Sequence, residues 1–265
     1  MKVCICAIAK EENVYLREWV EWHKNIGISK IFLYDNNDED GERFEDVIND
    51  YVESGFVQII SCLRGINYGN RQMFAYNDFY KSEESLEYDW VAFIDIDEYI
   101  NTNGIHINTV LSKDLYKNFD VIKLYWKYFG DNNIVRVNNT YSVRERFETA
   151  KSEVKKISKS IVRLNKNIGL ILVHNPYDEV PTCDEHGRKV PHICGEMLPG
   201  VKPTADIIWI DHFRYKTIEE FVKKMTRGVP RIGVSEYLTL DDFFKFNEKT
   251  PEKIEYLKSI GIEYE

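Results

Sequence analysis

The chain has 265 residues, of which 43% are hydrophobic and 14% aromatic, so it can bury a substantial core and is not intrinsically disordered. Its formal net charge of −9 at pH 7 argues against a nucleic-acid-binding protein, which needs a basic face. The five cysteines include no CxxC pair. The N-terminus has no signal-peptide pattern, and no apolar stretch approaches the roughly 18 residues of a membrane-spanning helix. From these features we expect a cytoplasmic protein.

Strand and helix patterns alternate over the first hundred residues. An apolar run predicts a strand over 3–9, and helical spacing predicts a following helix that Asn13 caps and Gly27 ends. Further strands are expected at 31–34, at 56–60 and up to Asp95, with helices at 44–51 and 71–80. This order predicts an α/β fold with a parallel sheet and right-handed crossovers.

Polar clusters lie where these predicted strands end. The clusters are 10–12, 35–37, the loop 64–72 and 95–97. In such sheets the ligand lies beyond the carboxyl ends of the strands, which share one edge. We therefore expect the clusters to converge on one site at that edge.

The most informative stretch is Trp90–Tyr99, in which an apolar run leads into Asp95 and Asp97. In an extended strand, side chains two residues apart point the same way, so both carboxylates are expected on one face at the strand tip. Two carboxylates held close together repel each other unless a cation lies beside them. Oxygen ligands suit Mg²⁺ or Mn²⁺, and an ion presented in this way most often binds a phosphate.

The pattern changes after Gly104. Strands are expected at 120–129, 157–164, 170–173 and 207–210. The segment 175–203 is rich in Pro, Gly, Asp and His, which is typical of a long functional loop. Apolar spacing from Ile218 to Met225 predicts a late helix, and two short helices are expected to finish the chain.

Four stretches carry a resemblance to a known family. They are Lys10-Glu11-Glu12 with Tyr15 to His23 and Gly27; Tyr34 to Asp40; Phe93 to Tyr99; and Asp211 to Tyr215 with Glu219 to Phe221, Lys224, Arg227 and Gly228. In this order they resemble bacterial nucleotide-sugar glycosyltransferases of the GT-A fold, in the family 2-like and family 92-like group. Glu11 stands where that family usually has Asn.

The resemblance implies a single α/β domain over 1–265 with a GT-A fold. This fold is Rossmann-like, with a mostly parallel central sheet flanked by helices, a smaller acceptor-side sheet and C-terminal helices. The resemblance assigns 1–103 to a nucleotide-sugar-binding half, 104–235 to an acceptor half and 236–265 to the C-terminal helices.

The resemblance also implies a reaction. A sugar would move from a nucleoside diphosphate, with a UDP-sugar favoured, to an acceptor hydroxyl with inversion, in surface polysaccharide or glycan synthesis. The acceptor would be a glycan or a lipid-linked sugar, and peripheral contact with the inner face of the membrane stays open. Nucleic acid is not expected as a partner.

Mn²⁺ or Mg²⁺ is the expected cofactor, with Asp95, Asp97 and His212 as ligands, because carboxylates suit both ions and imidazole tolerates Mn²⁺. In the family the second aspartate is the firmer ligand, so Asp97 is also counted as catalytic. For His212 the alternative is a histidine at the edge of the core.

Several residues are expected to contact the donor: Glu12, Asp35, Arg71, Gln72, Asp95 and Lys159. For Asp35 the alternative is an Asx turn, and for Arg71 a surface position. Lys159 and Arg163 are either phosphate partners or exposed strand cations.

The acceptor hydroxyl must lose a proton, and one Asp or Glu suffices as general base in a direct displacement. Glu145 is the first candidate, followed by Asp131, Asp184 and Glu185. The alternative for such residues in an acidic chain is a solvated surface position. Trp126 and Tyr128 either stack on a sugar ring or belong to an ordinary core strand.

Three other interpretations stay open at this point. Cys183, His186, His192 and Cys194 have ligand types that suit zinc, although their spacing departs from common zinc sites. A phosphohydrolase would use Asp95 as nucleophile and Asp97 as acid and base. A non-catalytic nucleotide- or carbohydrate-binding module would keep the same fold.

Overall fold

The computed structural model describes residues 1–62, 70–138, 140–165, 168–227 and 238–264. Contacts between Cα atoms divide the chain into two compact units. The first contains Met1–Lys127 and Val154–His212, and the second contains Tyr128–Glu153 and Phe213–Glu265. The division into donor half, acceptor half and C-terminal helices stays a prediction, because contacts do not test which part binds which substrate.

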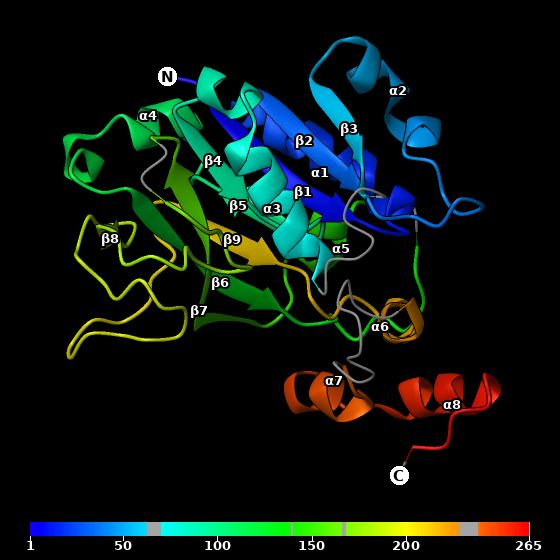
Figure 1. The fold of residues 1–265 in the computed structure, drawn as a ribbon. Coiled ribbons are helices and arrows are strands. Elements are labelled where there is room, and N and C mark those ends of the chain that lie inside the picture. Colours follow the sequence, from blue (N-terminus) through cyan, green and yellow to red (C-terminus); the bar gives the residue numbers. More distant parts are fainter. Residues whose placement is uncertain (63–69, 139, 166–167, 228–237, 265) are drawn as a thin grey trace. The chain divides into compact units, whose positions relative to one another are not determined.

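The first unit begins with a parallel α/β arrangement (Figure 1). Its elements are β1 (Val3–Ala9), α1 (Asn13–Asn25), β2 (Lys30–Asp35), α2 (Glu45–Glu53), β3 (Val57–Ser61), α3 (Arg71–Lys81) and β4 (Trp90–Phe93). β1 pairs in parallel with β2 and β4, and β2 pairs in parallel with β3. These elements and their parallel pairing confirm the α/β prediction.

Burial on both faces of β1 explains its continuous apolar sequence. Every residue of β1 is buried, as is typical of a strand in the middle of a parallel sheet. Cys4, Cys6 and Ile8 belong to the same core as Ala75 and Phe79 of α3. The α3 helix therefore covers one face of this part of the sheet.

The later strands extend the same sheet. They are β5 (Glu98–Asn101), β6 (Val121–Phe129), β7 (Ser152–Arg163), β8 (Thr182–Cys183) and β9 (Trp209–His212). Among the described residues the sheet has nine strands in the order β3-β2-β1-β4-β7-β6-β9-β5, with β8 paired to β6. β7 pairs antiparallel to β4, and β9 antiparallel to β5. The strands expected to form a smaller acceptor-side sheet are thus continuous with the central one.

Two strands expected from the sequence differ in the structure, because side chains from distant parts of the sequence bind their backbone. Residues 170–173 form no strand but a single bridge between Ile171 and Pro176. There Asn77 accepts from the Ile171 N–H at 2.9 Å and donates to its carbonyl at 2.7 Å. The strand expected at 207–210 begins at Trp209, because the Glu185 carboxylate binds the N–H groups of the three residues before it. At both places, hydrogen bonds from side chains replace the backbone hydrogen bonds that would join neighbouring strands.

The start of α1 also differs from the prediction. Glu12 is the N-cap residue, although its side chain makes no capping hydrogen bond, and Asn13 is the first helical residue. The Asn13 N–H donates to Glu42 and its side chain donates to the Arg43 carbonyl, so Asn13 ties α1 to the segment before α2. The predicted end is confirmed, since Gly27 follows the helix with φ of 99°, a conformation that favours glycine.

Short helices complete both units. They are α4 (Ile107–Leu111), α5 (Val143–Phe147), α6 (Ile218–Arg227), α7 (Leu240–Phe246), α8 (Pro251–Ser259) and the 3₁₀ turns Glu84–Glu87 and Asp114–Tyr116. The helix predicted near 218–225 and the two C-terminal helices are confirmed. Within the described residues, no helix combines the length and apolar character needed to cross a bilayer.

A buried ion pair joins α5 and α6 in the second unit. Both guanidinium NH₂ groups of Arg146 donate to the carboxylate of Glu220 at 2.8 Å, and only 4% and 3% of these side chains are exposed. Burial alone would raise the pKa of Glu220, but the hydrogen bonds and charge of Arg146 lower it to about 2. Thr217 adds two further donors to this carboxylate.

The lowered pKa of Glu220 predicts a pH-dependent stability. The ordinary pKa is 4.5 and the folded one is about 2, so the ion pair contributes fully above about pH 4.5 and is lost as the pH falls towards 2. Urea unfolding of the wild-type protein and Glu220→Gln at pH 6, 4 and 3 tests this sign. The difference in unfolding free energy should shrink from pH 6 to pH 3, and a difference that stays constant would contradict the assignment.

Candidate active site

The site is built on a turn between β4 and β5. β4 ends at Phe93, and Ile96 and Asp97 lie in a turn, so the expectation of an extended strand through Asp97 was wrong. The Glu98 carboxylate accepts the Asp95 N–H at 2.9 Å, and the Glu98 N–H donates to the Asp95 carbonyl at 3.1 Å. These two hydrogen bonds fold the chain back into β5, and strand alternation no longer decides where the aspartates point.

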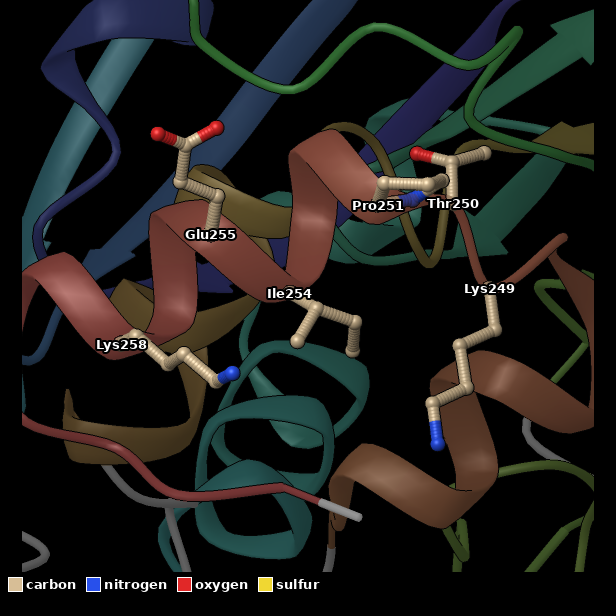
Figure 2. Close-up of a pocket in the computed structure, with 6 residues that line it drawn as sticks. All are labelled: Lys249, Thr250, Pro251, Ile254, Glu255 and Lys258. Atoms are coloured by element: carbon tan, nitrogen blue, oxygen red, sulfur yellow. The ribbon is translucent and has the colours of Figure 1, made fainter.

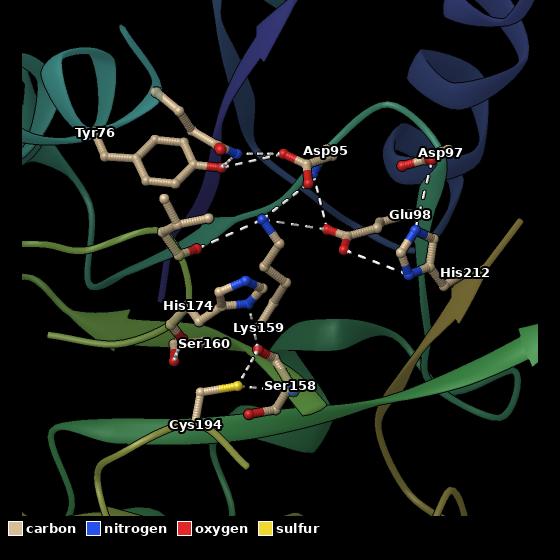
Figure 3. Close-up of polar contacts among 12 residues, drawn as sticks. Tyr76, Asp95, Asp97, Glu98, Ser158, Lys159, Ser160, His174, Cys194 and His212 are labelled. Carbon is tan, nitrogen blue, oxygen red and sulfur yellow. Dashed lines mark hydrogen bonds and ion pairs between the residues drawn. The ribbon is translucent and has the colours of Figure 1, made fainter. Parts of the chain in front are cut away.

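Asp95 is held by three side chains (Figure 3). Gln72 donates its amide to the Asp95 carboxylate at 2.5 Å, and the Tyr76 hydroxyl lies at 3.5 Å. Lys159 Nζ lies 3.0 Å from the other carboxylate oxygen. About a third of the Asp95 side chain is exposed, so it can still meet a ligand while its orientation is fixed.

Lys159 on β7 is the buried cation of the site. None of its side chain is exposed, so the alternative of an exposed strand cation was wrong. Its ammonium also lies 3.8 Å from Glu98 and above the Tyr76 ring. Burial alone would lower the pKa of Lys159, but the charges of Asp95 and Glu98 raise it well above its ordinary value. Lys159 is therefore positively charged at neutral pH.

Asp97 and His212 form the other side of the site. His212 is the last residue of β9 rather than following it, and it lies opposite Glu98 in the antiparallel pair of β5 and β9. His212 Nε2 lies 3.5 Å from Asp97 Oδ2, while Nδ1 lies 3.8 Å from Glu98 Oε1. The imidazole is 4% exposed and packs edge to face against Trp126, with the ring centroids 4.5 Å apart.

The charges at this site fit a divalent cation. Asp95, Asp97 and Glu98 bring three carboxyl groups together with one lysine, and their mutual repulsion is reduced by a bound cation. Burial raises the pKa of Glu98 well above its ordinary value; Lys159 opposes this, and Asp95 and Asp97 add to it. Two neighbouring ligands around an ion with bonds of ~2.1 Å lie about 3 Å apart, so Asp97 Oδ2 and His212 Nε2 are close to a suitable spacing.

The three predicted metal ligands are not gathered around one point. Among the described residues, the one group of three His, Cys, Asp or Glu side chains with ligand atoms mutually within 4.8 Å is Glu185, His186 and Asp206. Asp95 instead faces Lys159 and Gln72. Asp97 and His212 thus fit a metal ion directly, and Asp95 fits contact with a ligand or with a metal-bound water. The zinc interpretation requires Cys183, His186, His192 and Cys194 to lie together, and in the described part of the chain no three of them have ligand atoms within 4.8 Å of one another.

The first turn of α3 joins two of the predicted polar clusters. Arg71 donates to Asn36 Oδ1 at 2.6 Å, while the next residue, Gln72, donates to Asp95. The ends of β2 and β4 are thereby connected, as the parallel sheet predicts. Of the loop predicted at 64–72, residues 64–69 lie outside the described residues, as does Gly228 of the fourth motif.

Two predicted donor contacts, Asp35 and Glu12, lie at the ends of elements of the parallel sheet region. Asp35 is half-buried at the end of β2, where its Oδ1 accepts the Asn37 N–H at 2.8 Å and forms the Asx turn that was the alternative. Burial raises the pKa of Asp35, and the hydrogen bond from Asn37 opposes that shift. Glu12 is 7% exposed at the N-cap position of α1.

The general-base candidates all have structural partners. Glu145 is exposed at the third residue of α5, where its carboxylate and Ser142 form a capping box. The Ser142 N–H, and then its hydroxyl, lower the pKa of Glu145, which makes it a weaker base. Asp131 pairs with the buried Lys253. Asp184 binds Arg188, and Glu185 binds the backbone before β9.

The remaining predicted residues are packing groups. Trp126 is 5% exposed between His174 and His212, which favours the core interpretation. Tyr128 packs on Tyr215 and Phe246 in the second unit. Arg163 lies over the Trp90 ring at 4.1 Å and donates to the carbonyls of Tyr116 and Phe119, so it is not a free phosphate partner.

Sequence reasoning assigned no role to His174 and Glu98. His174 Nδ1 lies 3.1 Å from the Ser158 carbonyl, and burial together with the charge of Lys159 lowers the pKa of His174 to about 4. It is therefore a neutral imidazole beside the site at pH 7. No motif contains His174. Glu98 belongs to the third motif, and its position directly after Asp97 could have pointed to a role at the site.

Two surface pockets are lined by residues other than the predicted metal ligands. One, of about 460 Å³, is lined by Lys249, Thr250, Pro251, Ile254, Glu255 and Lys258 (Figure 2). The other, of about 580 Å³, is lined by Tyr34, Gln58, Ile60, Phe74, Asn77, Asp78, Lys81, Ser82 and Glu84. Neither pocket is lined by Asp95, Asp97 or His212, so both lie apart from the candidate active site.

Comparison with known proteins agrees with the motifs. A glycosyltransferase family 92 protein of Oryza sativa subsp. japonica is 34% identical over 119 residues, which are 45% of this chain and 19% of that protein. One from Ricinus communis is 30% identical over 135 residues, covering 44% of this chain and 19% of the relative. The match thus spans about a fifth of each curated relative's length.

Likeness to solved structures is more distant. A crystal structure of S. aureus TarS 1–349 has 14% sequence identity and a TM-score of 0.40, over 62% of this chain and 47% of that one. The family comparison is more specific, because the sequence profile named Glycosyltransferase family 92 matches residues 1–226. The chain belongs to glycosyltransferase family 92.

Proposed function

We propose that the chain is a metal-dependent glycosyltransferase that moves a sugar from a nucleoside diphosphate, with UDP favoured, to an acceptor hydroxyl with inversion. Family membership supports the reaction class. The observation that carries the proposal is the pairing of Asp97 with His212 at 3.5 Å, beside Asp95 just beyond β4. In a parallel sheet this is the edge where ligands bind.

The residues on the two sides of the site have different proposed roles. Asp97 and His212 would hold Mn²⁺ or Mg²⁺, which when bound supplies positive charge for the leaving diphosphate. Asp95, fixed by Gln72 and Lys159, is an oriented acceptor for a donor hydroxyl. Lys159 lies between Asp95 and Glu98 and offsets part of the repulsion between these carboxyl groups. An acceptor on a glycan or a lipid-linked sugar, in surface polysaccharide synthesis, completes the proposal.

The phosphohydrolase alternative is less compatible with the contacts of Asp95. As a nucleophile, that carboxylate would have to attack phosphorus with an available oxygen lone pair. In the structure one oxygen accepts from Gln72 at 2.5 Å and the other pairs with Lys159 at 3.0 Å. Both interactions stabilise the carboxylate and reduce its nucleophilicity. Family membership also favours sugar transfer.

Turnover with a panel of UDP-, GDP- and TDP-sugars, in Mn²⁺ or in EDTA, tests the proposal. We expect one donor to release its nucleoside diphosphate with an acceptor glycan present, and EDTA to abolish the release because the diphosphate loses its counter-charge. Release that is unchanged in EDTA would contradict metal dependence. Phosphate release from simple monoesters would instead support the phosphohydrolase, and sugar binding without turnover would support a binding module.

A further inference from the structure

The Glu98 carboxyl group is not among the groups proposed to hold the metal ion or the donor. Its side chain is fully buried, although carboxylates are almost never fully buried without partners. It directly follows Asp97 and begins β5, where it lies opposite His212 across the strand pair. A carboxyl group buried at this point of the site needs a reason, because burial of an acid is costly unless its contacts compensate.

Each oxygen of Glu98 faces a different side of the site (Figure 3). Oε2 accepts the Asp95 N–H at 2.9 Å and lies 3.8 Å from Lys159 Nζ. Oε1 lies 3.8 Å from His212 Nδ1. The backbone carbonyl of Glu98 accepts from the Trp19 indole at 2.8 Å, so the residue itself is anchored to α1.

At 3.8 Å the contact between Oε1 and Nδ1 is longer than a hydrogen bond, but its direction is that of the second partner of a metal-binding histidine. When an imidazole binds a metal through one nitrogen, the other nitrogen usually faces a carboxylate, which fixes the ring orientation and the tautomer. His212 presents Nε2 to Asp97 and Nδ1 to Glu98. The Trp126 ring restricts the imidazole from another side.

We propose that Glu98 is a positioning residue that orients the His212 imidazole through Oε1 and the Asp95 turn through Oε2, so that both sides of the cation site are set by one buried carboxylate. This inference rests on the proposed function, because it assumes that Asp97 and His212 hold the ion. Lys159 Nζ lies 3.8 Å from Oε2 and offsets part of the cost of burying this carboxyl group.

Mn²⁺ affinity, measured without any substrate by the loss of the free-ion electron paramagnetic resonance signal, tests the inference. Glu98→Gln keeps the side-chain shape, and we expect it to weaken Mn²⁺ binding by about 10-fold or more. Glu87→Gln, an exposed glutamate on the 3₁₀ turn before β4, is the matched control and should bind as the wild type does. Thermal unfolding in EDTA shows whether each variant is folded.

A double-mutant cycle separates positioning from a general loss of negative charge. If Glu98 acts through His212, then Glu98→Gln should weaken Mn²⁺ binding much less in a His212→Gln background than in the wild type. An equal loss in both backgrounds would overturn the inference. Glu98→Asp, which keeps the charge and shortens the side chain, is the second variant if Glu98→Gln does not fold. A charge effect alone predicts wild-type affinity for it, whereas positioning predicts weaker binding.

The outcomes also distinguish this inference from the proposed function. If Asp97→Asn loses Mn²⁺ binding while the Glu98 variants bind normally, the positioning role is wrong and the proposed function stands. If the wild-type protein does not bind Mn²⁺, the metal-dependent function fails and the inference falls with it.

Discussion

Sugar transfer is expected to fall by about a thousandfold when Asp97 is replaced by Asn, because the charge of a bound metal is worth several kcal/mol in the transition state. The change removes a negative charge and keeps the shape of the side chain. Asp97 is 6% exposed and its Oδ2 lies 3.5 Å from His212 Nε2. The neighbouring carboxyl groups face other partners, since Asp95 faces Lys159 and Glu98 faces His212 Nδ1, so neither has the geometry of Asp97. Initial rates with the best donor of the panel, at saturating Mn²⁺, measure the loss.

The control for this experiment is Asp114→Asn. Asp114 is an exposed residue of a 3₁₀ turn in the same unit, and its replacement should leave the rate unchanged. Unfolding temperatures of both variants in EDTA should match the wild type, which shows that the rate change is not a folding defect. An Asp97→Asn protein that retains a tenth or more of the activity would show that Asp97 is not a metal ligand.

Loss of about 3–5 kcal/mol in the free energy of unfolding is expected when Arg146 is replaced by Met. The change leaves the Glu220 carboxylate with 3% exposure and without its bidentate partner. An uncompensated buried charge costs more than the lost attraction, which is why removing one member of a buried pair has such large effects. Urea unfolding at pH 7 measures the difference.

The double variant Arg146→Met, Glu220→Leu provides the matched comparison. Replacing both members by apolar groups removes the buried charge, so most of the lost stability should return. A single Arg146→Met variant that unfolds with wild-type stability would mean that Glu220 reaches water or another cation when the arginine is absent. That result would contradict the buried ion pair as a determinant of stability.

The parallel part of the fold could be predicted from the sequence because its signals are local. The apolar run at 3–9 and the helical spacing up to Gly27 each specify their own element. The later strands could be predicted less well, because distant side chains decide where they begin. Asn77 binds the backbone of Ile171, and Glu185 binds the residues before β9, so neither strand boundary is visible in its own segment.

The sequence predicts where the candidate site lies, but its internal contacts could not be predicted. The apolar run into Asp95 and Asp97 marks the strand end, and the motif at Asp211 and His212 marks its partner. The burial of Lys159 could not be predicted, because β7 changes from exposed to buried along its length. The carboxyl groups that explain a buried cation there belong to Asp95 and Glu98, which are far away in the sequence. The turn that Glu98 closes was likewise hidden by the apolar pattern.

The most direct test of the central claim is a crystal structure of the protein with Mn²⁺ and UDP, in which anomalous scattering locates the metal. We predict one strong anomalous peak within bonding distance of Asp97 Oδ2 and His212 Nε2, with the diphosphate on its open side. A manganese ion bound only at Glu185, His186 and Asp206, or a diphosphate bound away from Asp97, would contradict the account.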